Sequence, residues 1–198
     1  MAEITSDMIK ALREATQAGM VDCKKALQET NGDMDKAVEF LRKKGLASAE
    51  KKMGHAATEG IISSYIHHNK KIGVMLELRT VTDFVARNPD FQELANEICM
   101  HIAALGPEYL KPEDVPAEVV EKEKDIYREQ MKDSGKPANV VEKIVEGKLT
   151  KFYSDICLLE QIYFKDGKTL IKDLIKEKIA VFGENIEIAR FIRYQIGG

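Results

Sequence analysis

The chain has 198 residues, of which 44% are apolar and 32% are charged, with a formal net charge of −3 and a pI of about 5.9. This length suits one core domain with a small additional domain, and the composition is that of an ordinary globular protein. The mild negative charge argues against general affinity for nucleic acids, which requires a concentrated basic face.

The N-terminal residues, the lengths of the apolar runs and the cysteines further restrict the class of protein. The first residues, Met1 to Ile4, are acidic, and no apolar run reaches the roughly 18 residues of a membrane-spanning helix. We therefore expect a cytoplasmic protein that binds no membrane. Cys23, Cys99 and Cys157 are widely spaced, and no CxxC pair indicates a zinc or dithiol site. We expect three partly buried thiols, no metal and no other cofactor.

Residues 1–45 predict a bundle of three short helices. Gly19 ends the first helix, Met20 begins the second, and Asp33 can cap the third, which we expect to end at Gly45. Each helix has apolar residues at helical spacing: Met8, Ile9 and Leu12; Cys23, Ala26 and Leu27; Met34, Ala37, Val38 and Leu41. A bundle of this size has a thin core.

Residues 46–60 predict a linker, because they are rich in Ala, Lys and Gly and lack an apolar period. Residues 61–198 predict the core domain. In residues 61–80, alternating side chains on both sides of Asn69-Lys70 indicate a β-hairpin. A third strand is expected over residues 188–196, where both faces carry some apolar side chains.

Helices are predicted between these strands. One begins at Asn88-Pro89, an N-cap followed by proline at the first helical position, and ends at Gly106-Pro107. Two charged helices over about residues 116–155 are joined by a short turn, which predicts a projecting antiparallel hairpin. A last helix covers about residues 168–182. The fold class is therefore predicted to be α+β.

Motifs for catalysis are missing from the sequence. It contains no GxSxG, HExxH or GxGxxG pattern. Gly167-Lys168-Thr169 resembles the end of a phosphate-binding loop, but Ile162 occupies the position of the required first glycine. His67 and His68 are neighbours in a predicted strand and should point to opposite faces, so they cannot share a metal. We expect a protein that is not an enzyme.

Two stretches are unusual. Residues 82–88 connect a strand to a helix, where Phe84 and Val85 either anchor the connection in the core or form an exposed wedge for a partner. Residues 18–27 begin a helix with Met20 and Val21, which cannot both face a thin core, so we expect one to be exposed.

These stretches resemble the elongation factor Ts family, and the resemblance covers essentially the whole chain. Residues 12–27 are similar to the first signature of the family and residues 82–88 to the second. Five shorter matches follow the family order: Asn31-Gly32-Asp33, Lys43-Lys44-Gly45, and residues 49–52, 142–149 and 157–161. The length is similar to the short bacterial form, which has one copy of the central module.

The resemblance implies a ubiquitin-associated-like three-helix domain joined to a core with a three-stranded antiparallel sheet and a helical hairpin. It implies a guanine nucleotide exchange factor that binds the GTPase EF-Tu, both GDP-bound and nucleotide-free, and acts as a homodimer paired through its sheet. Docking on the GTPase domain is implied for Gly19, Met20, Val21 and Lys24. Insertion beside the nucleotide, with displacement of Mg²⁺, is implied for Thr82, Asp83, Phe84 and Val85.

The sequence departs from the family pattern in three places. Arg79-Thr80-Val81 replaces a usual Asn-Cys-Glu before the second signature, Gln17 replaces a glycine, and Ile162 replaces a common proline. Three other readings remain open. They are a generic ubiquitin-associated-like binding module without exchange activity, an RNA-binding protein using Lys43-Lys44 and Lys51-Lys52, and an enzyme with an unrecognised site.

Overall fold

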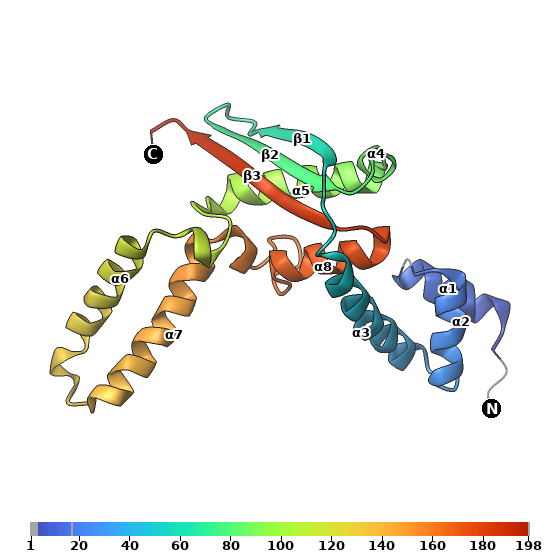
Figure 1. The fold of residues 1–198 in the computed structure, drawn as a ribbon, viewed down its shortest axis with the longest axis horizontal. Coiled ribbons are helices and arrows are strands. Elements are labelled where there is room, and N and C mark those ends of the chain that lie inside the picture. The colour runs from blue at the N-terminus through green and yellow to red at the C-terminus, as the bar shows by residue number, and fades with distance from the viewer. Residues whose placement is uncertain (1–3, 17, 198) are drawn as a thin grey trace. The chain divides into compact units, whose positions relative to one another are not determined.

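The computed structural model describes residues 4–16 and 18–197, which form an α+β fold with a three-stranded antiparallel sheet of order β1-β2-β3 (Figure 1). Gln17, one of the departures named above, lies outside the described residues. None of the described helices is both long and apolar enough to cross a membrane. The elements follow in this order: α1 (Ser6–Thr16), α2 (Met20–Glu29), α3 (Met34–Lys52), β1 (Glu59–Ile66), β2 (Ile72–Thr80), α4 (Asp83–Ala86), α5 (Pro89–Leu105), η1 (Pro112–Asp114), α6 (Ala117–Gln130), η2 (Lys132–Ser134), α7 (Ala138–Ile156), η3 (Leu158–Glu160), α8 (Ile171–Phe182) and β3 (Ile186–Gln195).

The chain divides into two compact units. As far as they are described, the first comprises Met1–Gly60, Arg79–Ala86 and Ile175–Glu187, and the second comprises Ile61–Leu78, Arg87–Leu174 and Ile188–Gly198. Each unit is thus assembled from segments that are distant in the sequence.

In the first unit, α1, α2 and α3 pack around a small common core. Helix α2 begins at Met20, as predicted, and Gly19 is its N-cap residue. The side chain of Asp33 caps α3, as predicted, by accepting a hydrogen bond from Lys36 N at 3.0 Å. The buried core residues are Leu12, Cys23, Ala26, Leu27, Ala37 and Leu41.

Helix α3 is longer than the sequence predicted. It continues through Gly45 to Lys52, so the first half of the expected linker is helical. Gly45 is not in the left-handed conformation of a helix end. Instead α8 packs against it, because a Cβ at Gly45 would lie 3.1 Å from Ala180 Cβ. Its missing side chain serves a close helix approach rather than a helix end, and Ala49 continues the buried stripe.

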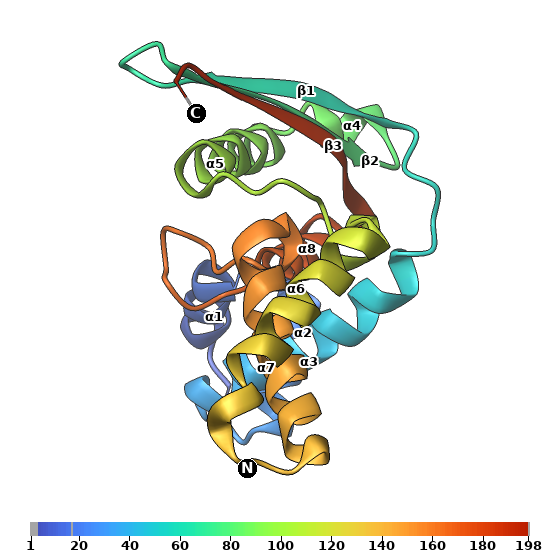
Figure 2. The same cartoon turned by 90° about the vertical axis from the view of Figure 1, so that its left-hand side faces the viewer.

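In the second unit, α5 lies along one face of the sheet (Figure 2). Its predicted ends are confirmed, because Asn88 Oδ1 accepts from Asp90 N at 2.9 Å and Gly106 takes φ +60°. On the sheet side, Arg193 Nη2 donates to the carbonyl of Ala103 at 3.3 Å. The buried stripe of α5 includes Phe91, Leu94, Ile98 and Ile102.

A buried histidine fastens α5 to the segment after α7. Phe164 N donates to His101 Nδ1 at 3.4 Å, and His101 Nε2 lies 3.0 Å from Gln161 Oε1. Because Nδ1 accepts a hydrogen bond, the proton of the neutral ring is assigned to Nε2. Burial lowers the pKa of His101, and the hydrogen bond with Gln161 opposes that shift only in part.

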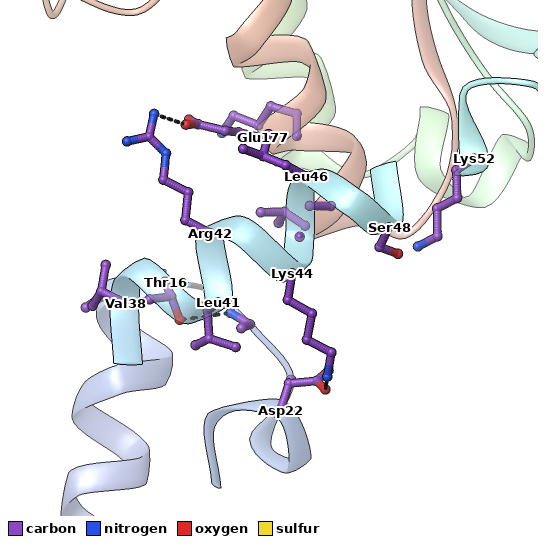
Figure 3. A pocket seen from close by; sticks show the side chains of 17 residues that line it. Thr16, Asp22, Val38, Leu41, Arg42, Lys44, Leu46, Ser48, Lys52 and Glu177 are labelled. Atoms are coloured by element: carbon purple, nitrogen blue, oxygen red, sulfur yellow. Dashed lines mark hydrogen bonds and ion pairs between the residues drawn. The ribbon is translucent and has the colours of Figure 1, made fainter. Parts of the chain in front are cut away.

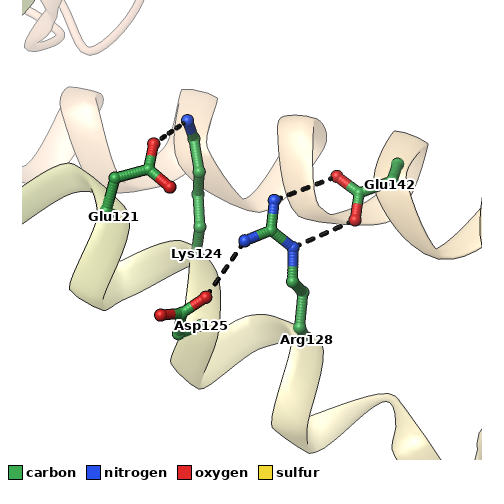
Figure 4. A network of polar contacts seen from close by, with 5 residues as sticks. All are labelled: Glu121, Lys124, Asp125, Arg128 and Glu142. Carbon is green, nitrogen blue, oxygen red and sulfur yellow. Dashed lines mark hydrogen bonds and ion pairs between the residues drawn. The ribbon is translucent and has the colours of Figure 1, made fainter.

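Helices α6 and α7 form the predicted antiparallel hairpin (Figure 1). Arg128 of α6 joins the two helices at the surface, since its Nε donates to Glu142 Oε1 of α7 at 3.0 Å and its Nη2 to Glu142 Oε2 at 3.3 Å (Figure 4). Its Nη1 donates to Asp125 Oδ1 within α6 at 3.0 Å. This arginine lowers the pKa of Glu142. No residue of α6 is buried, which agrees with the narrow apolar stripe of its sequence.

Helix α8 begins at Ile171, three residues later than predicted. The side chain of Asp166 accepts from the backbone N–H groups of Lys168 and Thr169 at 2.9 and 3.0 Å, which closes a turn. Residues 168–170 therefore belong to this turn and to a short bridge between Ile162 and Leu170.

Candidate functional site

The loop between β2 and α5, residues 80–86, is called the Phe84 loop here. Its two large apolar residues have opposite environments: Phe84 is 82% exposed, whereas Val85 is only 6% exposed. Both alternatives raised by the sequence are therefore realised, one at each residue. The resemblance assigned both side chains to insertion into a partner, but in this chain Val85 is buried within its own fold. Asp83, assigned to the same role, is exposed.

A carboxylate from a distant turn holds the Phe84 loop. Glu184 Oε2 accepts hydrogen bonds from Thr82 N at 3.0 Å and from Thr80 Oγ1 at 3.2 Å. Glu184 Oε1 accepts from Thr82 Oγ1 at 2.8 Å. The Thr82 oxygen in turn lies 3.4 Å from Val85 N, where it caps the single helical turn α4.

The adjacent residue, Asn185, fastens a third segment to the same turn. Its side-chain amide donates to the carbonyl of His55 at 2.8 Å and to that of Met53 at 3.3 Å. Neither Glu184 nor Asn185 was predicted from the sequence to have a functional role. The one local signal was Gly183, which precedes them and indicates a turn. A Gly-Glu-Asn sequence between periodic segments is otherwise typical of an ordinary polar turn.

The second candidate surface, the docking segment, consists of residues 19–24 at the start of α2. Met20 is 44% exposed and Val21 is 68% exposed, so both project from the thin core rather than one alone. Gly19 and Lys24 are also exposed. The backbone does not require glycine at residue 19, because its φ is −62° and a Cβ there would meet only Asp22 Oδ2 at 3.6 Å.

A hollow of about 470 Å³ lies beside the docking segment, bordered by the α1–α2 junction, α3 and α8 (Figure 3). Two ion pairs cross its rim: Lys44 Nζ with Asp22 Oδ1 at 2.8 Å, and Arg42 Nη2 with Glu177 Oε1 at 3.0 Å. No histidine or cysteine is among its described lining residues. The two ion pairs join α3 to α2 and to α8.

The sheet presents a third surface, called the outer sheet face, on the side away from α5. Arg190 and Glu77 form an ion pair there, with Nε and Oε2 2.6 Å apart. Six apolar residues on this face are between 43% and 72% exposed: Ile62, Ile66, Met75, Ile192, Tyr194 and Ile196. Several exposed apolar side chains on one face of a sheet are typical of an interaction surface.

In the described part of the chain, no three His, Cys, Asp or Glu side chains are placed to hold a metal ion. The three cysteines are buried thiols without disulfides. What the surfaces offer is exposed apolar area on fixed supports, which suits binding to another protein.

Comparisons with known proteins identify the family to which this chain belongs. The family model described as Elongation factor TS matches residues 3–198. Elongation factor Ts of Fervidobacterium nodosum is 62% identical, with 98% of this chain and 99% of that protein covered. The proteins of the same name from Thermotoga maritima and Carboxydothermus hydrogenoformans are 60% and 57% identical over 98% of this chain, covering 97% and 89% of their own lengths.

Proposed function

Because the chain belongs to the elongation factor Ts family and is therefore a translation elongation factor, we propose that it is the guanine nucleotide exchange factor of the GTPase EF-Tu. It binds EF-Tu·GDP in the cytoplasm, displaces the Mg²⁺ ion at the nucleotide, and lets GDP leave. GTP can then enter the nucleotide-free partner. No covalent bond forms or breaks in this cycle, so the protein acts by binding rather than as an enzyme.

The observation that supports this function best is the exposed ring of Phe84 on a loop that is anchored on both sides. The ring contributes apolar area that is buried only when a partner receives it. A buried Phe contributes roughly 1.5–3 kcal/mol of transfer free energy. Since about 1.4 kcal/mol corresponds to a factor of ten, Phe84 alone weakens GDP binding by at most roughly a hundredfold.

Magnesium is the target of this insertion. The ion bridges the phosphates of the nucleotide and neutralises their charge, so GDP without Mg²⁺ has poorly compensated oxygens. Thr82 and Val85 position the loop, while the ring of Phe84 enters the partner. The remaining acceleration comes from the other contacts that strain the nucleotide site.

The docking segment supplies affinity without chemistry. Met20 and Val21 offer exposed apolar area, and Gly19 keeps the surface beside them low. Lys24 adds a positive charge on the same helix start. Docking is thus separate from insertion, and by linkage any factor that weakens GDP is itself weakened by GDP to the same extent. That antagonism returns the exchange factor for another cycle.

The outer sheet face pairs two copies of the chain as a homodimer. Two such faces can cover each other about a two-fold axis, which hides the apolar residues of both. Replacing Tyr194, which is 67% exposed, by Asp places a charge in this contact, and sedimentation should then show monomers. We further propose that helices α1–α3 form a ubiquitin-associated-like domain, because they are three helices packed around one small core.

The direct test is the release of a fluorescent GDP analogue from EF-Tu, with and without this protein. Exchange activity predicts that release becomes faster as the protein is added and that excess unlabelled GDP does not mimic this effect. A generic ubiquitin-associated-like module would bind without changing the release rate. An RNA-binding protein would bind RNA in the absence of EF-Tu, with an affinity that falls steeply as salt rises.

A further inference from the structure

We propose that Glu184 is a positioning residue for nucleotide exchange, which holds the Phe84 loop in the conformation that enters the partner. This inference rests on the proposed function and adds a residue outside both family signatures. Glu184 lies about a hundred positions after the loop, yet it binds the loop through three donor groups: Thr80 Oγ1, Thr82 N and Thr82 Oγ1.

The loop needs support from outside because its own structure is minimal. α4 has four residues, and a single helical turn in isolation is unfavourable, since nucleation fixes several backbone dihedrals for one hydrogen bond. Phe84 is almost fully exposed, so its ring contributes little to this support. Buried Val85 and Ala86 hold the end of the turn, and the bonds to Glu184 hold its beginning.

A carboxylate suits the geometry of these donors. An ionised glutamate is a pure acceptor with two oxygens, and here both oxygens are used. The Thr82 hydroxyl donates its hydrogen bond to Glu184, which leaves a lone pair of the Thr82 oxygen facing Val85 N. Glu184 therefore controls the cap of the turn as well as its entry.

The support of Glu184 is itself rigid. Asn185 and Ile186 are buried, and the Asn185 amide is fastened to the carbonyls of Met53 and His55. Glu184 consequently projects from a backbone that cannot drift with the loop. The same turn is hydrogen-bonded both to the segment after α3 and to the Phe84 loop. The loop is therefore anchored to the unit that also contains the docking segment.

Losing Glu184 should lower the rate of insertion, because the loop must then be ordered when it enters the partner. For Glu184→Ala we expect the maximal GDP release rate to fall roughly tenfold, which corresponds to about 1.4 kcal/mol. The half-saturating concentration should stay unchanged, since the docking segment is intact. The maximal rate of Glu184→Gln should lie between those of wild type and Glu184→Ala, because the amide retains only one acceptor oxygen.

The experiment measures the maximal rate and the half-saturating concentration with EF-Tu loaded with fluorescent GDP, using the full-length protein. Glu187→Ala is the matched control, since Glu187 is an exposed glutamate three positions further on, and it should behave as wild type. Amide hydrogen exchange of residues 82–86 should accelerate in Glu184→Ala, with no change in α2. If Glu184→Ala does not fold, by circular dichroism, Glu184→Gln serves in its place.

An unchanged maximal rate in a folded Glu184 variant would overturn this inference, as would a change confined to the half-saturating concentration. Either result would leave the proposed function standing, because wild-type protein would still accelerate GDP release. If wild-type protein fails to accelerate release, the proposed function fails instead. The two failures are therefore distinguishable within one data set.

Discussion

The Phe84 loop and the docking segment both expose apolar side chains, but they are supported in different ways. Val21 stands on a ten-residue helix whose other face packs into a core formed by neighbouring helices. Phe84 stands on one helical turn that depends on Glu184, about a hundred positions away. A surface for affinity can therefore be built locally, whereas a surface that must enter another protein needs long-range anchors.

The largest effect is expected from separating the neighbours Phe84 and Val85. Phe84→Ala should reduce the acceleration of GDP release by roughly ten- to a hundredfold, from the lost burial of the ring. Its thermal stability should not fall, because the ring is exposed. Val85→Ala should instead destabilise the fold by roughly 1–3 kcal/mol, since it deletes buried methyl groups.

Release kinetics and urea unfolding of both variants measure these two effects. Phe164→Ala is a suitable control, because Phe164 is another exposed phenylalanine and lies outside the loop. Equal losses of activity and stability in Phe84→Ala and Val85→Ala would show that the two side chains have no separate roles.

A smaller effect is expected at the docking segment. Val21→Asp should raise the half-saturating concentration roughly tenfold, because it places a charge in an apolar contact, while the maximal rate stays the same. Its stability should change by no more than about 0.5 kcal/mol, as for most surface substitutions. Gln28→Asp, at the exposed far end of α2, is the control. A fall in maximal rate with unchanged affinity would assign Val21 to insertion.

The sequence allows the docking side of this comparison to be predicted better than the insertion side. The start of α2 at Met20 and the caps at Asp33 and Asn88 depend on neighbouring residues, so local patterns predicted them correctly. Gly45 misled the prediction because its role is set by Ala180 in α8, which no local pattern reveals. The opposite exposure of Phe84 and Val85 was equally hidden, since one helical turn has no measurable period.

Low pH provides a third comparison, between α5, which follows the Phe84 loop, and the helices α1–α3. Burial lowers the native pKa of His101 below its ordinary value of 6.5, so the unfolded chain binds the proton more readily. Stability should therefore be complete above that value and fall below it, by about 1.4 kcal/mol per pH unit until the native pKa is reached. The helices α1–α3 contain no histidine in their sequence.

Urea unfolding between pH 7.5 and 5.5 measures this loss, and His101→Gln should flatten the dependence. Hydrogen exchange should show α5, which follows the Phe84 loop directly, loosening before α2. A stability that is independent of pH in this window would contradict the assignment of a buried neutral His101.

The smallest effect is expected in the helical hairpin. Arg128→Met removes a surface ion pair, so it should change the thermal midpoint only slightly and leave exchange unaffected. The change should vanish near 1 M salt, where the screening length is about 3 Å. Because Arg128 lowers the pKa of Glu142 from its ordinary value of 4.5, the contribution of the pair is present above that value and is lost at lower pH. A large loss of exchange would place the hairpin among the docking surfaces.

The central claim, that Phe84 acts by removing magnesium from the partner, can be tested with one titration. GDP release from EF-Tu is measured with wild-type protein and with Phe84→Ala over a range of Mg²⁺ concentrations, including excess chelator. The account predicts a rate ratio of roughly ten- to a hundredfold in millimolar Mg²⁺ that shrinks toward one when Mg²⁺ is chelated. A ratio that stays constant across the titration would contradict it.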